Sequence, residues 1–237
     1  MQKLLKQPLL TSAGGELQNM AKSEESISKA LNLSLKNPKL FIPALVPIIV
    51  GTIFNFLAYV FATKYYIGMV EVTVPNMYIS LGGSLIAYVL GAIAGFVVVD
   101  MANDLLNDRP ADLKKSLNLA LSKFGTLILA AVIAALLSIT IILLPMALFI
   151  ITIVVVDGVN AIEGTKRSFN FVIKNLKESI IFILIVIIVQ VIFSLVLSVI
   201  PMIGSYIAGI VGWLLNIMFL VASVCFYHAL RGLPPPT

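Results

Sequence analysis

The feature that most constrains this chain is a run without any charged residue from Thr126 to Val156. As a helix rising about 1.5 Å per residue, these 31 residues would extend about 46 Å, which is too long for one upright crossing of a hydrocarbon core about 30 Å thick. Pro145 lies within the run, lacks an amide hydrogen and clashes with the preceding helical turn. The run therefore predicts two membrane-spanning helices with a break at Pro145.

The composition of the whole chain also indicates a membrane protein. Hydrophobic residues make up 60% of it and charged residues 11%, with a mean hydropathy of +1.07. Soluble domains carry about a quarter charged residues, so we expect an integral membrane protein. The net charge of +5 comes from short basic clusters beside the apolar spans, which favours a membrane surface over nucleic acid as the partner. Cys225 is the one cysteine, so we expect neither an internal disulfide nor a thiolate metal cluster, and no cofactor is predicted.

The pattern of apolar stretches predicts an all-α integral membrane protein with about six transmembrane helices, arranged as three hairpins. The spans are expected at about 40–62, 78–99, 126–144, 146–162, 179–200 and 205–226. The fourth span is short, so a re-entrant or heavily tilted element is the alternative there. The membrane domain would cover 26–228, between a flexible N-terminal tail at 1–25 and a C-terminal tail at 229–237.

An amphipathic segment precedes each expected hairpin, and we expect each to form a helix at the membrane interface. The three segments are Ser23–Pro38, Asp112–Phe124 and Ala161–Leu176. Each contains the pattern basic, any, Leu or Phe, Asn, Leu or Phe, any, Leu or Ile; the copies are Lys29–Leu35, Lys115–Leu121 and Arg167–Ile173. This recurrence predicts an internal repeat, each unit being one interfacial helix and one hairpin.

The distribution of basic residues predicts the topology. Six spans with both termini in the cytoplasm would place 15 of the 16 basic residues on the inner side, leaving only Lys64 outside. This distribution follows the positive-inside rule for a multi-pass protein of the cell membrane. The inner face would also attract anionic membrane lipids.

Small and polar residues within the spans are the candidate contact sites. Gly83, Ala87, Gly91 and Gly95 recur every four residues on the second span, which places them on one helix face and predicts close packing by another helix. Asn55, Gln190 and Asn216 are neutral intramembrane amides. We expect them to make hydrogen bonds between helices, whereas in a transporter they would line a wet cavity.

Charged and ionisable residues suggest sites at the inner side. Lys166, Arg167, Lys174 and Lys177 form a candidate lipid-headgroup patch, and a simple topology anchor is the alternative. Asp100, Asp104, Asp108 and Asp112 also recur every four residues and could attract a cation, but Pro110 interrupts the series and favours a solvated, helix-capping edge. His228, the one histidine, ends the last span, where we interpret it as an interfacial residue.

Two stretches carry a resemblance to a known family. Asp157–Asn175 reads DGVNAIEGTKRSFNFVIKN, and Phe226–Gly232 reads FYHALRG. In these the chain resembles a poorly characterised family of prokaryotic six-span membrane proteins related to the membrane domain of some glycerophosphodiester phosphodiesterases. Gly164 stands where that family more often has Ala. The resemblance implies a six-span fold, and because the chain has no phosphodiesterase domain it implies no such activity.

The sequence contains no Gly-x-Ser-x-Gly, His-Glu-x-x-His or phosphate-cradling glycine loop. We therefore expect a non-enzymatic integral membrane protein, and the leading hypothesis is an accessory or scaffold subunit that contacts other membrane proteins, or a second copy of itself, through the glycine face of the second span. A small transporter or channel is the first alternative, motivated by the repeat and the short fourth span. A lipid-binding or lipid-handling protein is the second.

Overall fold

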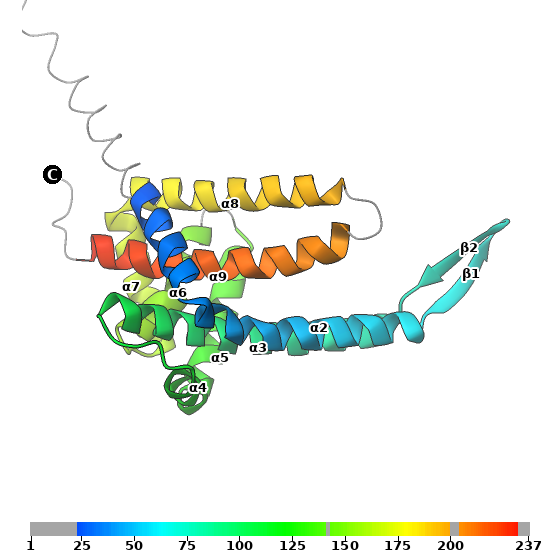
Figure 1. Ribbon diagram of the computed structural model, residues 1–237, viewed down its shortest axis with the longest axis horizontal. Coiled ribbons are helices and arrows are strands. Elements are labelled where there is room, and N and C mark those ends of the chain that lie inside the picture. Colours follow the sequence, from blue (N-terminus) through cyan, green and yellow to red (C-terminus); the bar gives the residue numbers. More distant parts are fainter. Residues whose placement is uncertain (1–22, 141–142, 200–203, 232–237) are drawn as a thin grey trace, which may run out of the picture.

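The computed structural model describes residues 23–140, 143–199 and 204–231, and these residues are mostly helical (Figure 1). A helix over 23–36 and a short 3-10 turn at Pro38–Phe41 lead into the main helices. The helices are α2 (Ile42–Val60), α3 (Met77–Leu106), α4 (Leu113–Ser122), α5 (Phe124–Ser138), α6 (Leu144–Val156), α7 (Ala161–Lys174), α8 (Leu176–Ser198) and α9 (Gly204–Leu230). Strands β1 (Thr63–Ile67) and β2 (Val70–Val74) form one antiparallel hairpin between α2 and α3.

Among the described residues, four single helices are long and apolar enough to cross a membrane. They are Pro38–Val60, Met77–Leu106, Leu176–Leu197 and Gly209–Leu230. They coincide with the first, second, fifth and sixth spans expected from the sequence, although the last reaches Leu230 rather than 226. Of the tails, 1–22 and 232–237 lie outside the described residues, while 23–25 belong to the first helix.

The third and fourth expected spans are shorter helices, so six full spans are not confirmed. With 15 and 13 residues, α5 and α6 extend only about 22 and 20 Å. The expected fourth span, 146–162, is wrong as one continuous helix because α6 ends at Val156. Gly158 there adopts a left-handed backbone (φ +69°), and the Asn160 side chain accepts from the backbone N–H of Glu163 to begin α7.

The helix α3 continues past Val99, where the second span was expected to end. Asp100 accepts from the Ser116 hydroxyl (2.6 Å), and Asp104, which is 2% exposed, pairs with Lys115 (2.5 Å) and Arg109 (3.1 Å). The expectation of a solvated edge is therefore wrong for Asp100 and Asp104, because groups on and beside α4 satisfy their carboxylates. Farther along, Asp112 accepts from the backbone N–H of Lys114 and of Lys115 and so caps α4.

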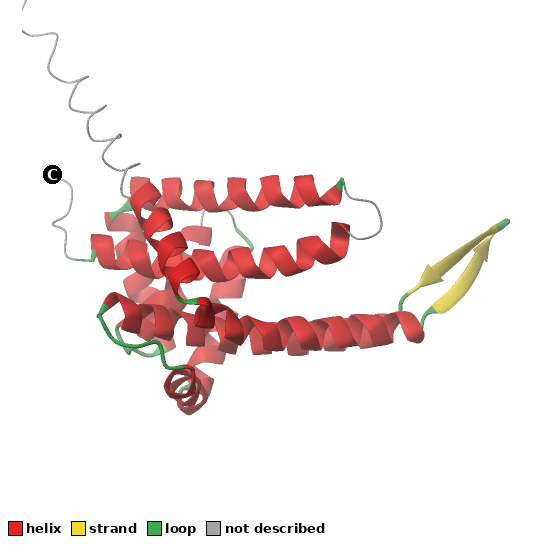
Figure 2. Ribbon diagram, viewed as in Figure 1, coloured by secondary structure: helices red, strands yellow, loops and turns green. Residues whose placement is uncertain are grey.

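The β-hairpin extends from the end of α2 and α3 that lies farthest from the other helices (Figure 2). The spans expected at about 40–62 and 78–99 are joined by this segment, for which no strand was predicted. Its strands pair from Thr63↔Val74 to Ile67↔Val70, and Gly68 provides the positive φ (+65°) that the turn requires. Lys64 pairs with Glu71 at 2.6 Å, and this hydrogen bond and charge lower the pKa of Glu71.

Helices occupy all three segments expected at the interface, and they share a pattern of burial. In each copy of the seven-residue pattern the second and sixth positions are buried. These are Ala30 and Ser34 in the first helix, Ser116 and Ala120 in α4, and Ser168 and Val172 in α7. The same positions of each copy therefore face the protein interior.

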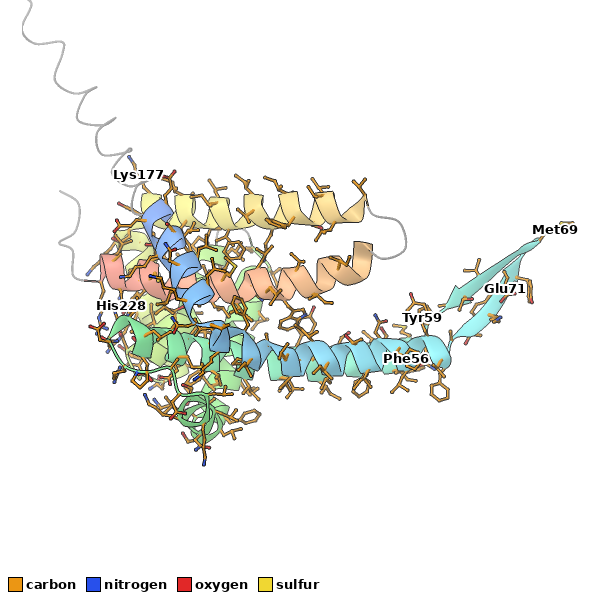
Figure 3. All side chains as sticks on the ribbon, viewed as in Figure 1. Phe56, Tyr59, Met69, Glu71, Lys177 and His228 are labelled. Carbon is orange, nitrogen blue, oxygen red and sulfur yellow. The ribbon has the colours of Figure 1, made fainter. Side chains whose placement is uncertain are left out.

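The buried core lies at the end of the molecule opposite the hairpin, where Figure 3 labels Lys177 and His228. We call this the basic end and the other the hairpin end. Four rings from α6, α7, α8 and α9 meet in the core: Phe149, Phe171, Phe182 and Phe226, with Phe182 and Phe226 centroids 4.7 Å apart. Toward the hairpin end, α2 and α8 instead expose large apolar side chains such as Phe56 and Leu195. Exposed apolar rows of this kind suit contact with lipid chains.

Candidate functional site

The four small residues of α3 lie against helices of the same chain. A Cβ atom added at Gly83 would overlap the Cβ of Phe54 on α2, and one added to Gly51 would lie 3.6 Å from the Cβ of Ala87. Gly91 and Gly95 face α9 instead, where added Cβ atoms would lie 2.7 Å from Trp213 and 3.3 Å from Leu220. The glycine face of α3 therefore holds α2 and α9 close, and these two helices occupy it.

A cavity of about 740 Å³ lies where these three helices meet. We call it the α2–α3–α9 cavity. Its volume falls within the range of about 300–1,000 Å³ that is typical of small-ligand sites. Glycine and alanine contribute much of the wall, namely Gly51, Ala87, Gly91, Ala92, Gly95, Gly209 and Gly212. The space exists because side chains are short along three facing helix surfaces.

Neutral polar and amphipathic side chains also line the cavity: Asn55, Ser80, Ser84, Tyr88, Trp213 and Asn216. None of the lining residues in the described part of the chain carries a formal charge. Within the described residues, the side-chain amides of Asn55 and Asn216 have no hydrogen-bond partner. An amide without a partner in an apolar medium costs several kcal/mol (about 2–7), so these two groups favour a polar occupant.

The three predicted intramembrane amides therefore do not share one site. Asn55 and Asn216 line one cavity, whereas Gln190 is exposed on α8 and does not line it. Asn216 stands 12 positions from Gly204 and 14 from Leu230, or about 18 and 21 Å from the two ends of α9. If α9 crosses the membrane, the amide lies near the middle of the bilayer.

The cavity is open rather than sealed. Tyr88 lines it and is still 72% exposed, and Asn55 and Ser84 are exposed as well. Figure 1 shows α9 diverging from α2 and α3 toward the hairpin end. The groups on its walls donate and accept hydrogen bonds, so the cavity can orient an uncharged polar group beside apolar surface.

Charged groups gather at the basic end, where Asp157 joins three helices. Its Oδ2 accepts from the Arg167 guanidinium of α7 (2.9 Å) and the Tyr227 hydroxyl of α9 (3.0 Å), while Arg231 lies 3.3 Å from Oδ1. The Asp157 side chain is 6% exposed. Glu163 and Asp157 together raise the pKa of Arg167. Arg167 is thus held in place by ion pairs with Asp157 and Glu163. Two other residues of the predicted headgroup patch, Lys166 and Lys177, are exposed.

The other ionisable candidates, His228 and Cys225, lie against residues that hold the helices together. His228 Nε2 lies 2.9 Å from Asn103 Oδ1, which links α9 to α3. No group of three or more His, Cys, Asp or Glu side chains that could hold a metal ion occurs within the described residues. Cys225 is buried in the core.

Most of the α9 face that lines the cavity was not predicted from the sequence. Gly209, Trp213, Asn216 and Leu220 follow one another at steps of four, three and four residues, and all line the cavity. This spacing places them on one helix face. The signal was therefore present in the sequence, but of these four residues only Asn216 was predicted as a candidate site.

Comparison with known proteins finds no match for this chain among protein families, curated proteins or solved structures. The resemblance to the six-span family stays a prediction.

Proposed function

We propose that this protein is a non-enzymatic multi-pass membrane protein that binds an uncharged amphiphile in the α2–α3–α9 cavity, and so belongs to the lipid-handling class. The observation that carries the proposal is that Asn55 and Asn216 face this cavity without a hydrogen-bond partner among the described residues. A hydroxyl or ester group of the ligand would supply that partner.

The walls suit the apolar part of the same ligand. Phe54, Ile151 and Leu220 line the cavity beside the two amides, and its opening lies at a level where the neighbouring spans would contact lipid chains. A membrane lipid with an uncharged head would therefore enter from the bilayer without crossing water. The mixture of apolar wall and a few fixed polar groups is the usual composition of small-ligand sites.

The scaffold hypothesis keeps its prediction of stoichiometric partners, but another surface would have to carry them, since α2 and α9 occupy the glycine face of α3. Transport is the second candidate. Two observations favour it: the mid-span position of Asn216 and the two short helices α5 and α6, since broken spans beside a mid-membrane site recur in transporters.

The ligand proposal can be tested by photolabelling. The probe is diacylglycerol with a diazirine and an alkyne in one acyl chain, added to the full chain in lipid nanodiscs. We expect crosslinks on α3 and α9 peptides, and about 30-fold less labelling in the double variant Asn55→Leu, Asn216→Leu, because it loses two hydrogen bonds worth about 1 kcal/mol each. Gln190→Leu is the matched control and should retain wild-type labelling. Equal labelling of all three proteins would refute the proposal, and flux of the probe between leaflets would add transport to binding.

We further propose four full spans, a re-entrant α5–α6 pair and both termini in the cytoplasm. Both ends of this pair lie at the basic end, where the Lys123 ammonium is 3.4 Å from the backbone O of Gly158. At about 20 Å each, the two helices would turn back inside a hydrocarbon core about 30 Å thick. Six spans with a short third and fourth helix are the alternative.

Single cysteines distinguish these topologies. In a chain carrying Cys225→Ala, a membrane-impermeant maleimide should label Met69→Cys in intact cells and Lys177→Cys only after permeabilisation. In the re-entrant arrangement Ile139→Cys should resist the reagent from both sides. Labelling of Ile139→Cys from outside would establish six spans instead, and labelling of Lys177→Cys in intact cells would reverse the proposed orientation.

A further inference from the structure

A second, smaller recess of about 220 Å³ lies at the basic end, between α7 and the end of α9. It shares no lining residue with the α2–α3–α9 cavity. Three cationic side chains line it, Arg167, Lys174 and Arg231, together with Asn170, Asn175 and Tyr227. The volume is below the range of about 300–1,000 Å³ typical of drug-sized ligands, so it suits one small group rather than a whole metabolite.

Two helix faces build the recess. On α7 the lining residues are spaced three, one and three positions apart: Arg167, Asn170, Phe171 and Lys174. At the end of α9 they are spaced three positions and one position apart: Tyr227, Leu230 and Arg231. Residues three and four apart lie on the same helix face, so each set points the same way. Phe171 and Tyr227 contact edge to face, with centroids 5.0 Å apart, and fix the two faces relative to each other.

The recess keeps positive charge after its internal ion pairs are counted. Three cations face two carboxylates, Asp157 and Glu163, which leaves a net charge of +1. Lys174 makes no ion pair or side-chain hydrogen bond with any described residue. Arg231 is 50% exposed, stacks over the Tyr227 ring at 5.8 Å, and lies 3.3 Å from Asp157, so part of its donor edge remains available.

Arginine forks, an ammonium and side-chain amides form the donor set that recognises phosphate oxygens. Arg231 immediately follows the candidate span Gly209–Leu230, which places it at the level of lipid headgroups if α9 crosses the membrane. We propose that this recess binds the phosphate ester group of a ligand, either a phospholipid headgroup or a soluble phosphate ester. Of the four residues expected to form a headgroup patch, only Arg167 and Lys174 line it.

The test measures binding of phosphatidylglycerol to the full chain in dodecyl maltoside by native mass spectrometry. We expect Lys174→Gln with Arg231→Gln to weaken binding about tenfold, because charge-assisted hydrogen bonds are lost. Lys166→Gln with Lys177→Gln is the matched control, since it removes the same charge at the same end outside the recess. The control should change binding less than twofold. Lys174→Gln alone breaks no ion pair or side-chain hydrogen bond among the described residues, and it should give part of the loss with an unchanged thermal midpoint.

Glycerol 3-phosphate, titrated calorimetrically into the same proteins, distinguishes the two sources. Binding of phosphatidylglycerol alone, with the expected dependence on Lys174 and Arg231, assigns the recess to a lipid headgroup. Binding of glycerol 3-phosphate with that dependence assigns it to a soluble ester. Equal weakening by the recess and control variants, or no binding of either ligand, overturns the proposal.

Discussion

Gly83→Ala should lower the thermal midpoint of the protein by about 3–10 °C. The added methyl group would overlap the Cβ of Phe54, which is fixed to the backbone of α2 and cannot rotate away. The helices α2 and α3 would have to separate, and overpacking of this kind costs about 1–3 kcal/mol, or roughly 2–4 °C per kcal/mol for a chain of this size.

Gly82→Ala is the control, because a Cβ atom there has nothing within 4 Å. It should leave the midpoint unchanged or raise it slightly, since alanine favours a helix interior by about 0.5–1 kcal/mol over glycine. The buried Cys225, the one cysteine of the chain, provides the measurement: a fluorogenic thiol reagent reports its exposure as the protein unfolds in detergent. If the two neighbouring alanines had the same effect, α2 and α3 would not approach each other at Gly83.

The second large effect is expected at Asp157, where one carboxylate connects α6, α7 and α9. Asp157→Asn keeps the shape of the side chain but removes the charge that faces Arg167 and Arg231. The Asp157 side chain is 6% exposed, so water does not replace the lost partner on that side. We expect a fall in midpoint of about 3–6 °C, because removal of one partner of a buried ion pair is costly, whereas the half-exposed arginines recover part of that cost in water.

Glu163→Gln is the matched control for Asp157→Asn because Glu163 pairs with the same guanidinium, 2.9 Å from Arg167 Nε. That pair is exposed on both sides, and exposed pairs contribute little, so the midpoint should change by about 1 °C or less. The same thiol assay measures both variants. A larger effect for Glu163→Gln than for Asp157→Asn would contradict the role assigned to Asp157.

The sequence predicts the four long helices well because each is a long apolar run. The expected first span at 40–62 corresponds to Pro38–Val60, and the fifth at 179–200 to Leu176–Leu197. It does less well where a helix ends within apolar sequence. The end of α5 at Ser138 lies seven positions before Pro145, and hydropathy alone does not reveal such an end because the residues on both sides are equally apolar.

Other misses had a local signal. Gly158 directly after Asp157 is a common helix stop, yet the fourth span was extended through it. The alternation in Val70–Val74, preceded by Gly68, is typical of a hairpin strand. By contrast, no local pattern predicts that Asp100 and Asp104 are buried, since their partners come from the following helix and its approach.

The candidate site was predicted in part. The regular spacing of Gly83, Ala87, Gly91 and Gly95 pointed to close helix contacts, and these residues do lie against α2 and α9. The spacing does not indicate which helices pack against that face, because this depends on the tertiary arrangement. Asn55 and Asn216 are 161 positions apart, so their convergence on one cavity, without Gln190, required the structure.

The β-hairpin also sets the rotational phase of α3 relative to α2. At its base the backbone N–H of Asn76 donates to the carbonyl of Ala58 (2.8 Å), and the Asn76 side chain caps α3. Residues inserted at the Gly68 turn leave that base untouched. One residue inserted into α3 between Met77 and Gly83 would instead turn the glycines by about 100° relative to that base and carry them away from Phe54. The number of residues between the base and Gly83 is thus fixed by helix contacts near the cavity, whereas the length of the tip is free to vary.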